Sequence, residues 1–190
     1  MVDEKVLISL ILEAGAHHAA ALPISAVRFE RSFRALCEAN TCRRYGTCYT
    51  CPPDAGDIDE LIAKAKQYAQ GILYQTVWPL EDSFDVEGMA EAGRQHTELT
   101  HRIMDILPKG EGLLHLATGG CSLCPECAKL RNEPCVYPDK ALVSVSAYGL
   151  HVSETAKAAG LKYNNGPNTV TFFGMVFFGR ANKGEESIVG

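Results

Sequence analysis

The stretch TVTFFGMVFF, residues 169–178, carries almost no polar side chains. A strand that faces water on one side alternates apolar and polar residues, whereas a strand covered on both faces is apolar throughout. We therefore predict that residues 169–178 form a strand in the middle of a sheet. The turn-rich segment NNGPN, residues 164–168, precedes this strand and marks its start.

Helical and strand patterns alternate along the rest of the chain. Apolar residues at helical spacing predict helices over residues 4–15 and 84–107, the second ending at Pro108 and Gly110. Asp57, with Glu60 three positions later, is typical of a helix start. Shorter runs predict helices near Pro138 and over residues 153–159, and strands over residues 25–29, 72–78 and 112–118.

These elements predict an α/β or α+β fold, a single-domain sandwich with a mixed sheet of about four strands flanked by helices. We expect one metal-binding domain over residues 1–180 and a polar tail over residues 181–190. If the strands over residues 25–29 and 112–118 run parallel, the cysteine-rich loops that follow them lie at one edge of the sheet.

Three cysteines at CxxCxxC spacing dominate the segment GGCSLCPECAKLRNEPC, residues 119–135. Such tandem spacing wraps the chain around one centre and is closer to the bacterial ferredoxin run than to zinc ribbons, whose CxxC pairs stand well apart. The spacing to the next cysteine is longer than in ferredoxins. Gly119 and Gly120 allow a tight turn, and their amides are candidate donors to sulfur. The candidate ligands are Cys121, Cys124, Cys127 and Cys135.

The other four cysteines gather in LCEANTCRRYGTCYTCPP, as Cys37, Cys42, Cys48 and Cys51. The even division into two groups of four favours a second metal centre, or one site that both groups share. Reduced, buried cysteines packed as small apolar residues are the structural alternative. A disulfide framework requires an oxidising compartment, which the sequence does not indicate.

Other residues support less specific chemistry. His96 lies on the apolar stripe of the long predicted helix, which favours a hydrogen-bonded core histidine. Glu98 and His101 have the ExxH spacing of di-iron bundles, but no second such pair accompanies them. The sequence contains no GxSxG, P-loop or HExxH motif, so it gives a hydrolase no support.

Charge and hydropathy indicate which partners and which cellular compartment to expect. A net charge of -5 opposes attraction to phosphate backbones, so nucleic acid is not an expected partner. The N-terminal segment is acidic where a signal peptide is basic, and its apolar run is too short to cross a membrane. We therefore expect a cytoplasmic protein without a membrane partner. A redox partner protein is expected, and the sequence is compatible with a homo-oligomer.

The linked motifs YGTCYTCPP, GGCSLCPECA, CVYPDKA, AYGLHV and YNNGPNTVTFFGMVFF give the chain a family resemblance over about residues 20–180. It resembles a prokaryotic cysteine-rich family of predicted metal-binding proteins, domain of unknown function 2284. The resemblance implies metal binding by the cysteines, most firmly by the CxxCxxC group with Cys135, and no established activity. It also suggests Tyr148, Gly149 and residues 164–168, Asn165 among them, as parts of the surrounding pocket.

These observations support three hypotheses of function. The favoured one is an iron–sulfur protein with one or two four-iron clusters, acting in electron transfer or in redox support of a partner enzyme, because four thiolates saturate such a cluster. The second is an enzyme in which an iron with an open coordination position acts as a Lewis acid on a small substrate. The third is a structural zinc site in an interaction module.

Overall fold

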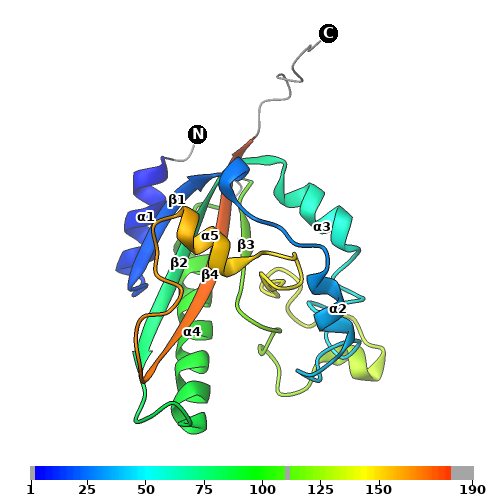
Figure 1. The fold of residues 1–190 in the computed structure, drawn as a ribbon. Helices are drawn as coiled ribbons and strands as arrows, with labels where there is room; N and C mark the ends of the chain where they lie inside the picture. The colour runs from blue at the N-terminus through cyan, green and yellow to red at the C-terminus, as the bar shows by residue number, and fades with distance from the viewer. Residues whose placement is uncertain (1–2, 110–111, 181–190) are drawn as a thin grey trace.

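The computed structural model describes residues 3–109 and 112–180 (Figure 1). Gly110 and the polar tail expected over residues 181–190 lie outside this range. In chain order the elements are α1 (Glu4–Glu13), β1 (His18–Pro23), the 3-10 helix η1 (Ile24–Ala26), α2 (Phe33–Glu38), α3 (Ile58–Ala65), β2 (Tyr68–Pro79), α4 (Val86–Ile106), β3 (Leu114–Leu116), the 3-10 helix η2 (Ala128–Arg131), α5 (Val152–Ala158) and β4 (Thr169–Arg180).

The four strands form one sheet in the order β1-β2-β4-β3, so β4 lies inside it, as its apolar sequence predicts. All three neighbouring pairs are antiparallel. The expectation of a mixed sheet is therefore corrected to an antiparallel one, and the fold is α+β. Among the described residues outside the named strands, one parallel bridge joins Ala117 to Ser144. Side-chain patterns identify strands but carry no information on their direction, which explains the difference.

Helices cover both faces of the sheet. On one face α1 and α4 pack Leu7, Ile11, Leu99 and Ile103 against Ile72 of β2 and its neighbours. On the other face α3, α5 and the segment 143–150 cover Leu73, Phe173, Met175 and Phe177. Burying each such side chain contributes roughly 1.5–3 kcal/mol. Three helices begin at an aspartate whose carboxylate accepts backbone N–H groups: Asp3 for α1, Asp57 for α3 and Asp85 for α4.

The helices predicted over residues 4–15, 84–107 and 153–159, and the helix opening at Asp57, are confirmed. The strand predicted over residues 25–29 is wrong, because Ile24–Ala26 form a 3-10 helix and the strand is the preceding segment His18–Pro23. Its alanines have little intrinsic β-preference, so pairing with β2 decides its conformation. The helix near Pro138 is also wrong: a turn from Tyr137 to Lys140 takes its place.

No helix of the described part of the chain is long and apolar enough to cross a membrane.

The Tyr74 side chain lies across one face of the sheet at its centre, in close contact with β4. Its side chain is fully buried, and its hydroxyl lies 3.1 Å from Thr100 Oγ1 of α4 and 2.8 Å from His115 Nε2 of β3. The partner position on β4 is Gly174, where a Cβ atom would lie 2.2 Å from Tyr74 Cζ. Glycine at residue 174 therefore leaves the space through which the tyrosine reaches both elements.

We expect Gly174→Ala to lower the free energy of unfolding by about 1–3 kcal/mol, because a methyl group there overpacks the Tyr74 ring. Gly93→Ala, in α4, is the matched control. A Cβ at residue 93 would meet Phe172 at an ordinary 3.4 Å, and alanine favours a helix by roughly 0.5–1 kcal/mol over glycine. Urea unfolding of both variants measures the difference, and equal stability of the two would contradict this account of the β2–β4 contact.

Two histidines lie buried between the sheet and α4. His96 Nδ1 is 2.8 Å from Thr76 Oγ1, and its Nε2 is 3.2 Å from Thr118 Oγ1. The core role predicted for His96 is thus confirmed. Burial lowers the pKa of His96 to about 4, and burial, followed by the charges of His101 and His96, lowers the pKa of His115 to about 3. Both rings are therefore neutral near pH 7.

The unfolded chain binds protons at these two histidines near pH 6.5, whereas the folded chain does not until pH 3–4. The contribution of these two neutral rings to the free energy of unfolding is therefore fully present above pH 6.5. It is lost as the pH falls toward the folded-state pKa values, by on the order of a few kcal/mol for each ring. We expect urea unfolding of His115→Gln to depend less steeply on pH between 6.5 and 4 than that of the wild type. Identical slopes would show that His115 is not held neutral.

Candidate metal centre

The two cysteine-rich segments lie side by side beyond the β3 edge of the sheet (Figure 1). One runs from α2 to α3 and the other follows β3, so the expected place of both at one edge is confirmed. The assumed parallel strands do not bring them there, since β1 and β3 run in opposite directions. We call residues 33–56 together with residues 119–137 the cysteine lobe.

Direct contacts join the two halves of the cysteine lobe. The Cys121 amide donates to Thr50 Oγ1 at 3.1 Å, and the Tyr49 hydroxyl donates to the Glu133 carbonyl at 2.7 Å. Lys129 pairs with Asp54 and also lies over the Tyr49 ring, 5.6 Å from its centroid. These contacts link residues more than seventy positions apart in sequence, so the two segments form one structural unit.

Five cysteines from both segments line one cavity: Cys48, Cys121, Cys124, Cys127 and Cys135. Arg44, Leu123, Ala128, Val136 and Tyr137 complete its wall. We call this space the thiol cavity. Four of its cysteines are half-buried, whereas Cys48 is only 1% exposed. The cavity therefore lies close to the protein surface with one of its thiols at the inner end.

Cys48 is hydrogen-bonded to two other thiols. Bonds from Cys121 and then Cys51 lower the pKa of Cys48, and the same bonds raise the pKa of Cys121 and of Cys51. Thr50 Oγ1 lies 3.3 Å from Cys48 Sγ. The three sulfur atoms therefore lie close together, and those of Cys48 and Cys51 are shielded from bulk water. Such an arrangement suits sulfur that bonds to a metal, which takes the thiolate form.

Thr50 is a site residue that sequence reasoning missed. It is 3% exposed, and its hydroxyl contacts both the Cys121 amide and the Cys48 sulfur. Its position between Cys48 and Cys51 in CYTC is the one signal that the sequence offers. A threonine two residues from a cysteine is too common to single out.

Gly120 is placed against the cysteines of the first segment. A Cβ atom at residue 120 would lie 3.1 Å from Cys51 Sγ, so its backbone passes close to that thiol. Gly119 has a positive φ of 66° and turns the chain out of β3. Gly119 therefore turns the chain and Gly120 allows the close approach to Cys51, while donation of their amides to sulfur stays a prediction.

Cys37 and Cys42 do not line the thiol cavity. Both lie on a separate groove between α2 and the segment 146–153. The structure thus groups the cysteines differently from the two sequence groups of four. Five line the thiol cavity, Cys51 lies beside it next to Cys48, and two line the groove.

The donor set of the thiol cavity fits a thiophilic metal or an iron–sulfur cluster. Among the described residues that line it, sulfur is the donor at five positions, and no carboxylate or imidazole takes part. Sulfur ligands select iron–sulfur clusters, zinc and copper(I) over hard cations. Within residues 3–109 and 112–180, no three Cys, His, Asp or Glu side chains already converge on one ion-sized point.

The pocket residues suggested by the family resemblance lie elsewhere. Tyr148 is 1% exposed in the core, where burial, followed by the charge of Tyr68, raises its pKa to about 12. Gly149 has a φ of 65°, and a Cβ there would meet the Glu30 carbonyl oxygen at 2.8 Å. Asn165 donates to Thr171 Oγ1 at 3.0 Å. None of the three lines the thiol cavity.

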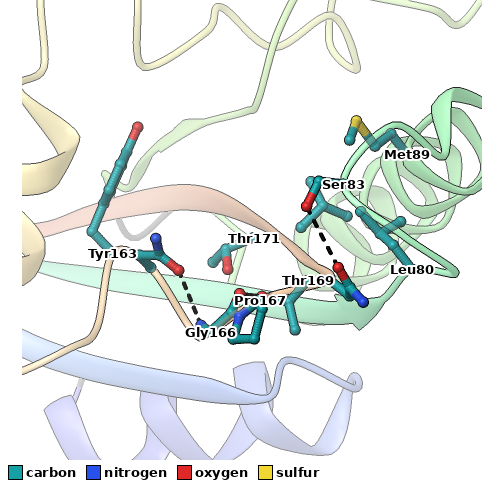
Figure 2. Close-up of a pocket in the computed structure, with 11 residues that line it drawn as sticks. Leu80, Ser83, Met89, Tyr163, Gly166, Pro167, Thr169 and Thr171 are labelled. Atoms are coloured by element: carbon teal, nitrogen blue, oxygen red, sulfur yellow. Dashed lines mark hydrogen bonds between the residues drawn. The ribbon is translucent and has the colours of Figure 1, made fainter.

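The Asn165 loop borders a different and larger cavity of about 760 Å³, shown in Figure 2. The loop around Gly166 and Pro167 forms one side, and Leu80, Ser83 and Met89 form the other. Ser83 donates to Asn168 Oδ1 across it at 3.4 Å. The described side chains lining it include no cysteine, histidine, carboxylate or lysine, so it offers neither a metal ligand of these types nor a strong acid or base.

Of the comparisons with known proteins, the family match agrees with the donor set. Neither the curated proteins nor the solved structures contain a match to this chain. The family described as predicted metal-binding protein (DUF2284) matches residues 20–178, which include all eight cysteines. The chain belongs to this family of predicted metal-binding proteins.

Proposed function

We propose that this protein holds an iron–sulfur cluster in the thiol cavity and acts in electron transfer or in redox support of a partner enzyme. The observation that carries the proposal is the cavity itself, in which five cysteines from two distant segments face one space. A four-iron cluster is the simplest occupant, because the CxxCxxC group supplies three closely spaced thiolates.

The fourth ligand comes from one of two positions. We assign it to Cys135, which lines the cavity together with the three cysteines of the CxxCxxC group. Cys48 is the competitor, because it is hydrogen-bonded to Cys121 from the other segment. With Cys135 as ligand, Cys48 and Cys51 remain beside the cluster as hydrogen-bonding neighbours. Such neighbours tune the reduction potential of a cluster.

The position of the cavity suits exchange of electrons with another protein. Cys121, Cys124, Cys127 and Cys135 are half-buried, so a cluster bound to them lies near the surface. Four thiolates leave no open iron, and transfer of electrons is then the available chemistry. A redox partner protein is accordingly part of the proposal.

Two other functions use the same cavity. If Cys135 is not a ligand, an open iron position is available for Lewis-acid chemistry on a small substrate. If zinc occupies the site, the cysteine lobe is a structural unit, and its folding depends on the metal. The all-sulfur donor set is compatible with both occupants.

Analysis of protein purified without oxygen separates these possibilities. The proposal expects a brown protein with iron and acid-labile sulfide in comparable amounts. Colourless protein with stoichiometric zinc and no acid-labile sulfide would remove both iron hypotheses. The structural zinc function would then take their place.

The thiol cavity and the groove should respond differently to loss of one cysteine. We expect Cys124→Ala to abolish metal binding, because Cys124 is the central residue of the CxxCxxC group. Cys42→Ala should retain the metal, since Cys42 lies outside the cavity. Metal analysis of the two variants tests this expectation, and equal loss in both would place Cys42 in the ligand set.

Paired serine variants identify the fourth ligand. Loss of a thiolate changes the electronic spectrum and the potential of a cluster. We therefore expect Cys135→Ser to alter the electron paramagnetic resonance signal of the reduced protein and to increase its sensitivity to oxygen, while Cys48→Ser keeps its iron. The reverse result would move the fourth ligand to Cys48. Signals unchanged in both variants would favour the open-site enzyme.

A further inference from the structure

Cys37 and Cys42 share a groove of about 480 Å³ outside the thiol cavity. Cys37 is half-buried in the last turn of α2, and Cys42 is exposed. Both side chains line this one groove although they are five positions apart in sequence, which brings the two thiols into the same small space. The cysteine lobe thus contains a pair of thiols that the proposed metal site does not use.

Two consecutive turns bring the pair together. The Asn40 amide donates to the Cys37 carbonyl at 3.0 Å, and the Arg43 amide donates to the Asn40 carbonyl at 3.0 Å. Asn40 has a left-handed φ of 52°, which ends α2 and reverses the chain. Its side chain also accepts from the Tyr45 amide at 3.0 Å. Cys42 is therefore carried back to the groove that Cys37 lines.

The walls of the groove are apolar on both sides. α2 contributes Phe33 and Leu36, and the opposite side contributes Leu150, Val152 and Tyr163. Leu36 is 67% exposed and Tyr163 is 56% exposed, so the groove presents apolar surface to the solvent. The Arg34 guanidinium donates to the Gly56 and Ala147 carbonyls and so holds α2 in place.

His151 lies on the same groove. Its ring centroid is 5.1 Å from that of Phe33, and its Nδ1 lies 3.2 Å from Ser153 Oγ. Phe33 and Cys37 are four residues apart and share one face of α2. The imidazole is therefore on the side of the helix that carries Cys37.

We propose that Cys37 and Cys42 are a redox-active dithiol that reduces small disulfides with apolar substituents bound in this groove. The Cys42 thiolate attacks one sulfur of the substrate, forms a mixed disulfide and releases the first thiolate. Cys37, as thiolate, then attacks the Cys42 sulfur, closes the Cys37–Cys42 disulfide and releases the second thiolate. The substrate gains two electrons and two protons, and the protein loses the same.

The difference in exposure assigns the two roles. A thiol must be reachable for the first attack, which fits exposed Cys42, whereas half-buried Cys37 needs to reach only its neighbour. The proposal does not depend on the occupant of the thiol cavity, because no cavity residue takes part in the exchange.

The sequence allows a direct test on the protein as purified without oxygen. Trypsin cleaves after Arg34 and Arg43, so both cysteines fall on the single peptide 35–43. We expect the aromatic disulfide 2,2′-dithiodipyridine, added in equimolar amount, to convert this peptide to an internally looped form that lacks two hydrogens. Mass spectrometry after alkylation of free thiols distinguishes the loop from adducts.

Two serine variants test the roles. Cys37→Ser should stop at a thiopyridine adduct on Cys42, because the second attack is missing. Cys42→Ser should react at Cys37 at least about tenfold more slowly than the wild type reacts at Cys42. Wild-type protein with separate adducts on both cysteines, or with both thiols unreacted, would overturn the proposal. A looped peptide from protein that contains no iron would contradict the cluster proposal and support the dithiol proposal, because iron content and the mass of the peptide are measured independently.

Discussion

The pairing of β2 with β4 is the interaction on which the rest of the structure depends. Two twelve-residue strands lie side by side over almost their whole length, with Tyr74 opposite Gly174. This contact places the Tyr74 ring across a position without a side chain, from where its hydroxyl meets α4 and β3. One close approach thereby joins the two central strands, the long helix and the edge strand.

The cysteine lobe follows from that framework. β3 pairs with β4 through Leu114, His115 and Leu116, and the chain leaves this edge directly into Gly119 and Gly120. The first cysteine segment reaches the same place by another route, between α2 and α3. Thr50, Tyr49 and Lys129 then bind the two segments to each other. The thiol cavity is therefore built at a sheet edge from two segments that contact each other, rather than within one loop.

The lobe separates thiols into two environments. The cavity surrounds its thiols with each other and with the buried Thr50 hydroxyl, which suits a bound thiophilic metal. The groove leaves Cys42 open to water beside apolar walls, which suits exchange with a small disulfide. Membership of a predicted metal-binding family supports the first environment and leaves the second as a property of this chain's geometry.

The sequence by itself determined the central strand, most of the helices and the clustered cysteines of a predicted metal-binding family. The apolar run at residues 169–178 required cover on both faces, and the CxxCxxC spacing predicted a common centre, because both patterns are local in the chain. Only the tertiary structure decided strand direction, since the antiparallel sheet depends on how distant segments meet. It also decided which thiols share a space: Cys48 joins Cys121 across more than seventy residues, while its sequence neighbours Cys37 and Cys42 face another groove. These contacts depend on how β3, α2 and the cysteine lobe pack together, and the spacing of residues along the chain does not predict that packing.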